Sequence, residues 1–158
     1  MTISLGGFGH RFSNRISGVI AMRAETDLLK LLATMKPEMH PGEFVFATVS
    51  PANFKEVQDQ AWGWFREPEG ITLILEKSAA IAAHLDFAFP ARLITLTVHS
   101  SLEAVGFLAV ITEKLATAGI SVNAVSAYYH DHLFIPVDKA GLAMEILHQI
   151  MTEDNGKR

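Results

Sequence analysis

The side chains that could carry out catalysis are few, and their spacing does not suit it. His99 and Ser100 are adjacent in a predicted strand, where neighbouring side chains point to opposite faces. The carboxylates of Glu67 and Glu69 fall in a predicted turn rather than in a cleft. No Gly-x-Ser-x-Gly, Walker or His-Glu-x-x-His pattern occurs. We therefore predict no catalytic residue and a non-enzymatic protein, with an undescribed group-transfer site as the enzymatic alternative.

A metal centre is not predicted either. His130 and His132 flank Asp131, and His99 is the other histidine that invites a metal interpretation. A metal site needs three or four converging ligands, and no further carboxylate or histidine pair is expected near these. The chain has no cysteine, which excludes zinc–thiolate sites and disulfides. We expect His130-Asp131 to form a tight turn, with Asp131 as the turn former, and we predict neither a metal nor a cofactor.

The composition narrows the class of protein further. The 158 residues are 49% apolar and 19% charged, which is enough for a packed core. The net charge is −4 and no basic cluster occurs, so no nucleic-acid partner is expected. Apolar runs end well before the ~18 residues that a membrane helix needs, so no membrane partner is expected. Met1–Arg15 lacks the order of a secretory signal, and we expect a flexible tail there and a cytoplasmic location.

The first half of the chain is predicted to alternate strands and helices. Apolar residues at helical spacing in Leu28–Met35, preceded by Thr26 or Asp27 as N-cap, predict a helix. Trp62 and Trp64 are two residues apart and are expected to share one face of a strand. The predicted elements are a strand at Ile16–Met22, the helix, a strand at Phe44–Val49, a loop at Ser50–Gln60, a strand at Trp62–Arg66, a turn at Glu67–Gly70, a strand at Ile71–Leu75 and a helix capped by Ser78 that ends near Leu85.

The second half has a clearer pattern. Leu93–Val98 alternates apolar and polar residues as a strand does. Ser100 and Glu103 have the spacing of a capping box, which predicts a helix with an apolar stripe over Phe107–Leu115, and Gly119 is placed to end it. The remaining predicted elements are a long strand at Ile120–Tyr129, the His130-Asp131 turn, a strand at His132–Val137 and a last helix marked by Leu142, Ile146, Leu147 and Ile150.

These elements give two halves with the same β-α-β-β-α order. That order, with antiparallel strands and both helices on one sheet face, is that of the ferredoxin-like βαββαβ plait. We therefore predict an α+β protein of two such lobes. Each half lacks its own fourth strand, which has to come from the other half or from the strand that starts the next unit. The predicted divisions are a flexible tail at 1–15, an N-terminal lobe at 16–87, a C-terminal lobe at 88–152 and a polar tail at 153–158.

Two stretches of the second half carry a resemblance to a known family. They are Thr97-Val-His-Ser-Ser-Leu-Glu-Ala-Val-Gly106 and, after the predicted helix, Ala118-Gly-Ile-Ser-Val-Asn-Ala-Val-Ser126. This region, from about Arg92 to Met151, resembles an ACT domain, and it is similar to the ACT pair of aspartate kinases and to the cytosolic arginine sensors of animals. The whole chain resembles bacterial stand-alone tandem-ACT proteins of unassigned role, which share Phe65-Arg-Glu-Pro-Glu-Gly-Ile-Thr-Leu73 and His130-Asp-His132.

The resemblance implies a regulatory homodimer that binds an amino acid or a related metabolite where two modules meet. A helix N-terminus with unpaired N–H groups suits the ligand's carboxylate. Three of the implied residues could instead have a purely structural role: Ser100 as an N-cap, Gly106 as a packing glycine and Asn123 as a partner of a sheet edge. The alternative function is a structural interaction module without a ligand. The implied ligand-binding residues are His99, Ser100, Ser101, Val105, Gly106, Val122, Asn123 and Ala124.

Overall fold

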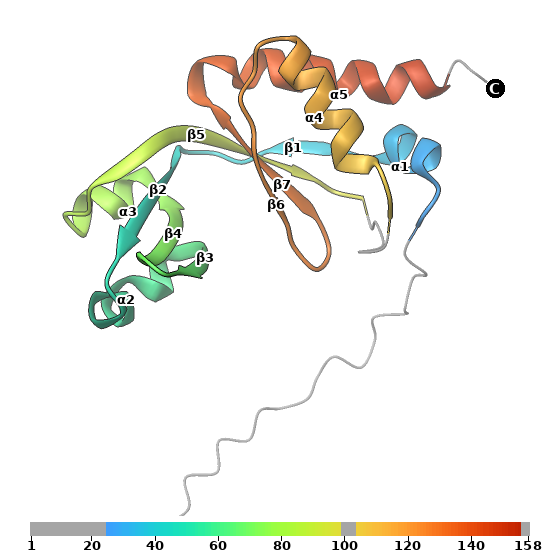
Figure 1. The fold of residues 1–158 in the computed structure, drawn as a ribbon. Helices are drawn as coiled ribbons and strands as arrows, with labels where there is room; N and C mark the ends of the chain where they lie inside the picture. The colour runs from blue at the N-terminus through green and yellow to red at the C-terminus, as the bar shows by residue number, and fades with distance from the viewer. Residues whose placement is uncertain (1–24, 99–103, 156–158) are drawn as a thin grey trace, which may run out of the picture.

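One antiparallel sheet runs through the protein, and helices cover one of its faces (Figure 1). The computed structural model describes residues 25–98 and 104–155. In this part of the chain the strands are β1 (Pro37–Met39), β2 (Phe44–Val49), β3 (Ala61–Glu67), β4 (Gly70–Glu76), β5 (Phe87–Leu96), β6 (Asn123–Ser126) and β7 (Asp131–Pro136). The helices are α1 (Leu28–Thr34), α2 (Pro51–Val57), α3 (Lys77–Ala82), α4 (Phe107–Thr117) and α5 (Ala140–Asn155).

Two lobes are interleaved in this sheet. Across the described residues the strand order is β3-β4-β2-β5-β7-β6, with β1 also paired to β5. The N-terminal lobe, β2-α2-β3-β4-α3-β5, has the element order and strand order of a βαββαβ plait. The C-terminal lobe is β5-α4-β6-β7-α5, and β1 takes the place of its fourth strand. The predicted ferredoxin-like α+β fold is confirmed.

Strand β5 serves both lobes because it is ten residues long and pairs along both edges. One edge pairs with β2 from Phe87 and with β1 up to Leu96, while β7 pairs with the other edge. The register with β2 shifts beside Phe89, which has a φ of 55°, and Pro90 falls at this irregularity, where its missing N–H costs no ladder bond. The sequence predicted that this strand starts at Leu93, whereas it starts at Phe87. The division into lobes at 16–87 and 88–152 stays a proposal.

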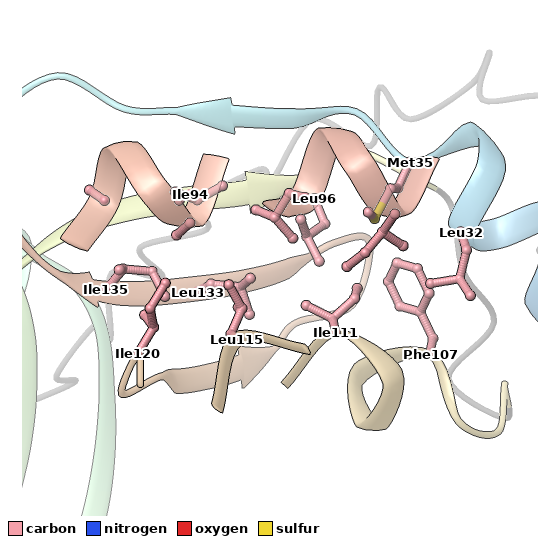
Figure 2. Packing of buried hydrophobic residues seen from close by; sticks show 14 of the residues in the cluster. Leu32, Met35, Ile94, Leu96, Phe107, Ile111, Leu115, Ile120, Leu133 and Ile135 are labelled. Carbon is pink, nitrogen blue, oxygen red and sulfur yellow. The ribbon is translucent and has the colours of Figure 1, made fainter. Parts of the chain in front are cut away.

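The larger apolar core belongs to the C-terminal lobe (Figure 2). Ile94 and Leu96 of β5 pack in one cluster with residues of α4, α5 and the first helix, α1. The sequence analysis counted α1 with the N-terminal lobe, whereas its apolar side chains pack in the core of the C-terminal lobe. The fully or nearly fully buried members include Leu31, Leu32, Met35, Phe107, Ile111, Leu115, Ile120, Leu133 and Ile135.

The N-terminal lobe has a smaller core, which depends on a helix that the sequence analysis missed. Residues Ser50–Gln60, predicted as a loop, contain α2 and a single 3₁₀ turn. The Ser50 side chain caps α2 by accepting a hydrogen bond from the backbone N–H of Asn53 at 3.3 Å, and Pro51 takes the first helical position. Phe54 and Val57 of this short helix are buried against β2 and β4.

Several predicted element ends are wrong, mainly at turns. Helix α3 begins at Lys77 after Glu76, so Ser78 is not its cap. Strand β6 is shorter than predicted, and its hairpin turns at Tyr128-Tyr129, closed by a hydrogen bond from the Ala127 N–H to the His130 carbonyl at 3.0 Å.

Asp131 is consequently not a turn former. It is a buried residue of β7 that accepts a hydrogen bond from the Ser126 hydroxyl at 2.6 Å. Helix α5 continues to Asn155, into the predicted polar tail. The predicted strand at Ile16–Met22 and the tail at 1–15 lie outside the described residues.

The β3–β4 hairpin offers a test of close packing at one glycine. A Cβ at Gly70 would lie 2.9 Å from both the Thr48 hydroxyl oxygen and the Val49 carbonyl oxygen. We expect Gly70→Ala to lower the free energy of unfolding by about 1–3 kcal/mol, because the backbone of β2 has to move. Gly63→Ala on the same hairpin is the control, since a Cβ there meets nothing within 4 Å. Equal urea midpoints for the two variants would contradict the close packing.

Candidate functional site

The loop implied by the sequence leads into α4 through a glycine. Helix α4 begins at Phe107, and its N-cap is Gly106, with a φ of 92° and no side-chain cap hydrogen bond. The capping box predicted from Ser100 and Glu103 is therefore wrong about where the helix starts. His99, Ser100 and Ser101 lie outside the described residues.

Gly106 is needed for its backbone conformation. A φ of 92° lies in the left-handed region that L side chains rarely adopt, and an added Cβ would be 3.4 Å from Leu28 of α1. The first N–H groups of α4 have no intrahelical partner, and the helix dipole places partial positive charge there. The start of α4 can therefore receive an anionic group such as a carboxylate.

The other described residues of the implied site lie near this helix and on β6. Val105 is 84% exposed, whereas Val122 packs against the core of the C-terminal lobe. Asn123 and Ala124 are exposed on β6. Register places Asn123 level with Leu93 of β5, through Phe134 of β7. Helix α4 follows the C-terminal end of β5 at Leu96, three residues beyond Leu93 along that strand.

The helix-free face carries a pocket that the sequence analysis missed. The sheet curves so that its two edge strands, β3 of the N-terminal lobe and β6 of the C-terminal lobe, contribute to one cavity of about 180 Å³. In Figure 1, β3 is drawn beside β4 and β6 beside β7, at the two edges of the curved sheet. The lining residues are Trp62, Gly63, Trp64, Phe65, Ile74, Val125, Ala127, His132 and Phe134.

A bulge in β3 decides which aromatic side chains reach this pocket. The register with β4 shifts between Ala61 and Gly63. As a result the ring of Trp62 packs against Phe44 on the helix-free face, with ring centres 5.5 Å apart. The ring of Trp64 packs against Phe54 of α2 at 5.1 Å, on the helix-covered face. The prediction that the two tryptophans share a face is therefore wrong, because the extra residue of the bulge breaks the strand alternation.

A chain of polar side chains crosses the sheet beside the pocket. The Thr95 hydroxyl, which is 5% exposed, lies 2.8 Å from Nε2 of His40 and 2.9 Å from Nδ1 of His132. A hydroxyl carries one hydrogen, so it donates to one ring and accepts from the other. His40 in turn packs edge-on against Trp62, with ring centres 5.2 Å apart. Thr95 thus fixes the orientation of His132 in the pocket wall.

The surroundings of His132 favour its neutral form. Burial lowers the pKa of His132 from its usual 6.5, and the nearby His130 and His40 lower it further, while Asp131 acts in the opposite direction. Near neutral pH the imidazole is therefore uncharged. Among the described residues, no group of three or more His, Asp or Glu side chains could hold a metal ion.

Comparison with known proteins identifies the family. Two family models, each described as an ACT domain, match residues 23–92 and 88–149. The chain belongs to the ACT domain family. ACT domains are regulatory modules, which supports a non-enzymatic protein. No curated protein matches the chain, and within the described residues no helix is long and apolar enough to cross a membrane.

Solved structures share this fold. A Vibrio cholerae protein, described as being of unknown function and a possible transport protein, is 43% identical, with a TM-score of 0.70 over 78% of this chain and 95% of that chain. The regulatory subunit of aspartate kinase from Thermus thermophilus is 10% identical, with a TM-score of 0.59 over 75% of this chain and 97% of that one. The structure of the aspartokinase alpha and beta subunits is 10% identical, with a TM-score of 0.59 over 73% of this chain and 97% of that chain. The aspartate kinase structures support the fold alone.

The lowered pKa of His132 predicts how stability depends on pH. The folded-state pKa lies below the unfolded value of 6.5, so the unfolded chain binds the proton first as the pH falls. The contribution of neutral His132 to the free energy of unfolding is complete above pH 6.5 and is lost as the pH falls through the folded-state pKa. We expect His132→Gln to flatten the melting temperature profile between about pH 7 and 5. His148→Gln, an exposed position on α5, is the control. Parallel profiles for wild type and His132→Gln would contradict the shift.

Proposed function

We propose that this ACT protein is a non-catalytic regulator that binds an amino acid or a closely related metabolite at the start of α4. Support comes from the tandem of ACT domains together with the glycine-capped N-terminus of α4. The proposed ligand-binding residues are those implied by the sequence, from His99 to Gly106 and from Val122 to Ala124. The proposed location is the cytoplasm.

The physical basis is the attraction between a carboxylate and the start of a helix. The uncapped N–H groups of the first turn of α4 can donate hydrogen bonds to carboxylate oxygens, and the helix dipole adds about 0.3–1 kcal/mol at an exposed site. Gly106 adds no side chain beside Leu28 of α1, which an added Cβ would approach to 3.4 Å. Exposed Asn123 on β6 offers an amide to a polar group of a ligand, in this module or in a partner's.

A thermal-shift screen against the common amino acids tests the class of function. A ligand at 100 times its dissociation constant stabilises by roughly 2.7 kcal/mol. We expect at least one amino acid to raise the melting temperature by several degrees, at about 2–4 °C per kcal/mol for a chain of this size. A screen without any shift would contradict amino-acid binding and favour an interaction module.

A pair of substitutions at Gly106 tests the position of the site. Asn and Asp are the side chains best tolerated at positive φ, and they have the same shape, so Gly106→Asn and Gly106→Asp carry a similar strain. We expect Gly106→Asp to weaken binding of the amino acid identified in the screen by about tenfold or more relative to Gly106→Asn, because the Asp carboxylate repels the ligand's carboxylate. The measurement is calorimetric titration. Equal affinities for the two variants would place the site elsewhere.

The exposed strand edges favour self-association. Among the described residues, β3 pairs with β4 alone and β6 pairs with β7 alone, and unpaired edges readily pair between chains. Trp64 and Phe65 on β3 are 45% and 48% exposed. We expect light scattering to give a homodimer, about twice the chain mass of 17.3 kDa. A mass of one chain across a dilution series up to high concentration would contradict it.

A further inference from the structure

We propose that the pocket on the helix-free face, between β3 and β6, is a second binding site that takes a small uncharged molecule with one flat apolar ring and one polar group. This site is separate from the proposed amino-acid site at α4. Its walls come from β3 and β4 of one lobe and from β6 and β7 of the other.

The size and lining of the pocket define the ligand class. A cavity of about 180 Å³ is close to the ~150 Å³ apolar cavity that is known to take benzene, so it fits one ring with a small substituent. None of the described residues that line it is Lys, Arg, Asp or Glu. A zwitterionic amino acid would lose the hydration of two charges there without gaining a charged partner. The pocket therefore selects against the ligand class proposed for α4.

The aromatic walls are held in place before any ligand arrives. Trp62 is packed edge-on against both Phe44 and His40. Phe134 is packed edge-on against Phe44 and Phe46, with ring centres 6.1 Å and 5.4 Å apart. Rings that are already fixed lose little conformational freedom on binding, which favours affinity. Trp62 remains 50% exposed and Phe65 48% exposed, so a ligand has apolar surface to cover.

His132 supplies the polar contact of the wall. Its Nδ1 is occupied by the Thr95 hydroxyl at 2.9 Å. Its Nε2 has no hydrogen-bond partner within the part of the chain that the structure describes, so this nitrogen is the one left for a ligand. The neutral state of the ring agrees with an uncharged ligand.

The chain has two tryptophans, which makes the pocket observable by fluorine NMR. With 5-fluorotryptophan incorporated, Trp62→Phe and Trp64→Phe assign the two resonances. The probes are phenol and benzene, with benzoate and benzylammonium as charged analogues. We expect the neutral rings to shift the Trp62 resonance more than that of Trp64, which packs against Phe54. Binding of the charged analogues as tightly as phenol would overturn the uncharged ligand class.

Gly63 allows the pocket to be filled without disturbing the core. It lines the pocket and pairs in register with Ile74, and a Cβ there meets nothing within 4 Å. We expect Gly63→Leu to weaken phenol binding by about tenfold or more. Gly141→Leu is the matched control, because Gly141 of α5 also has open space around it and lies outside the pocket. Unchanged affinity in Gly63→Leu, with both variants folded by melting temperature, would overturn the site.

The contribution of His132 is measured by comparing two probes. Phenol differs from benzene by one hydroxyl, and a net hydrogen bond is worth roughly a two- to tenfold gain in affinity. We expect His132→Leu to remove the preference for phenol over benzene while benzene still binds. Retention of the preference would overturn the role of His132.

Two further outcomes separate this pocket from a self-association surface and from the site at α4. A Trp62 resonance that moves with protein concentration and not with any probe would mean that a second copy of the chain occupies the pocket, and would overturn the proposal. Amino-acid binding at α4 is expected to survive Gly63→Leu, so failure of one site does not decide the other. Loss of amino-acid binding in Gly63→Leu would overturn their separation.

Discussion

The antiparallel pairing along β5 is the constraint on which the rest of the structure depends. One edge of this strand is shared by β1 and β2, which follow each other along the chain, and the other edge belongs to β7. Because the same ten residues hold both lobes, the lobes have one continuous helix-free face. The irregularity at Phe89 and Pro90 adjusts the register where one lobe passes into the other.

That shared face explains why aromatic side chains collect between the lobes. Phe44 and Ile74 of the N-terminal lobe and Leu93 and Phe134 of the C-terminal lobe form one buried cluster. No helix of the described residues belongs to this cluster, so curvature of the sheet and contact between rings bury it. The bulge in β3 adds Trp62, and Thr95 holds His132 beside it. The candidate pocket is thus a product of the way the lobes are joined.

Local sequence patterns predicted many of the helices and strands. The features that these patterns missed depend on contacts between residues far apart in the chain. The apolar run of β2, the apolar alternation of β4 and the apolar stripe of α4 indicated these elements correctly, because burial requires apolar residues at the spacing of a strand or a helix. The packing of α1 on the second lobe left no such record, since its partners are far along the chain. The bulge at Ala61–Gly63 likewise depends on its partner strand. The pocket therefore could not be predicted from the sequence.

The placement of β1 has a consequence for the order in which the chain assembles. Pro37 pairs with Leu96, so β1 leaves the ribosome long before its partner strand is made. The N-terminal lobe has all of its strands as soon as β5 emerges, whereas the C-terminal lobe must wait for α5 and also recruit α1 and β1 from the chain's beginning. Closing that long loop carries an entropic cost, which makes the C-terminal lobe the later one to fold.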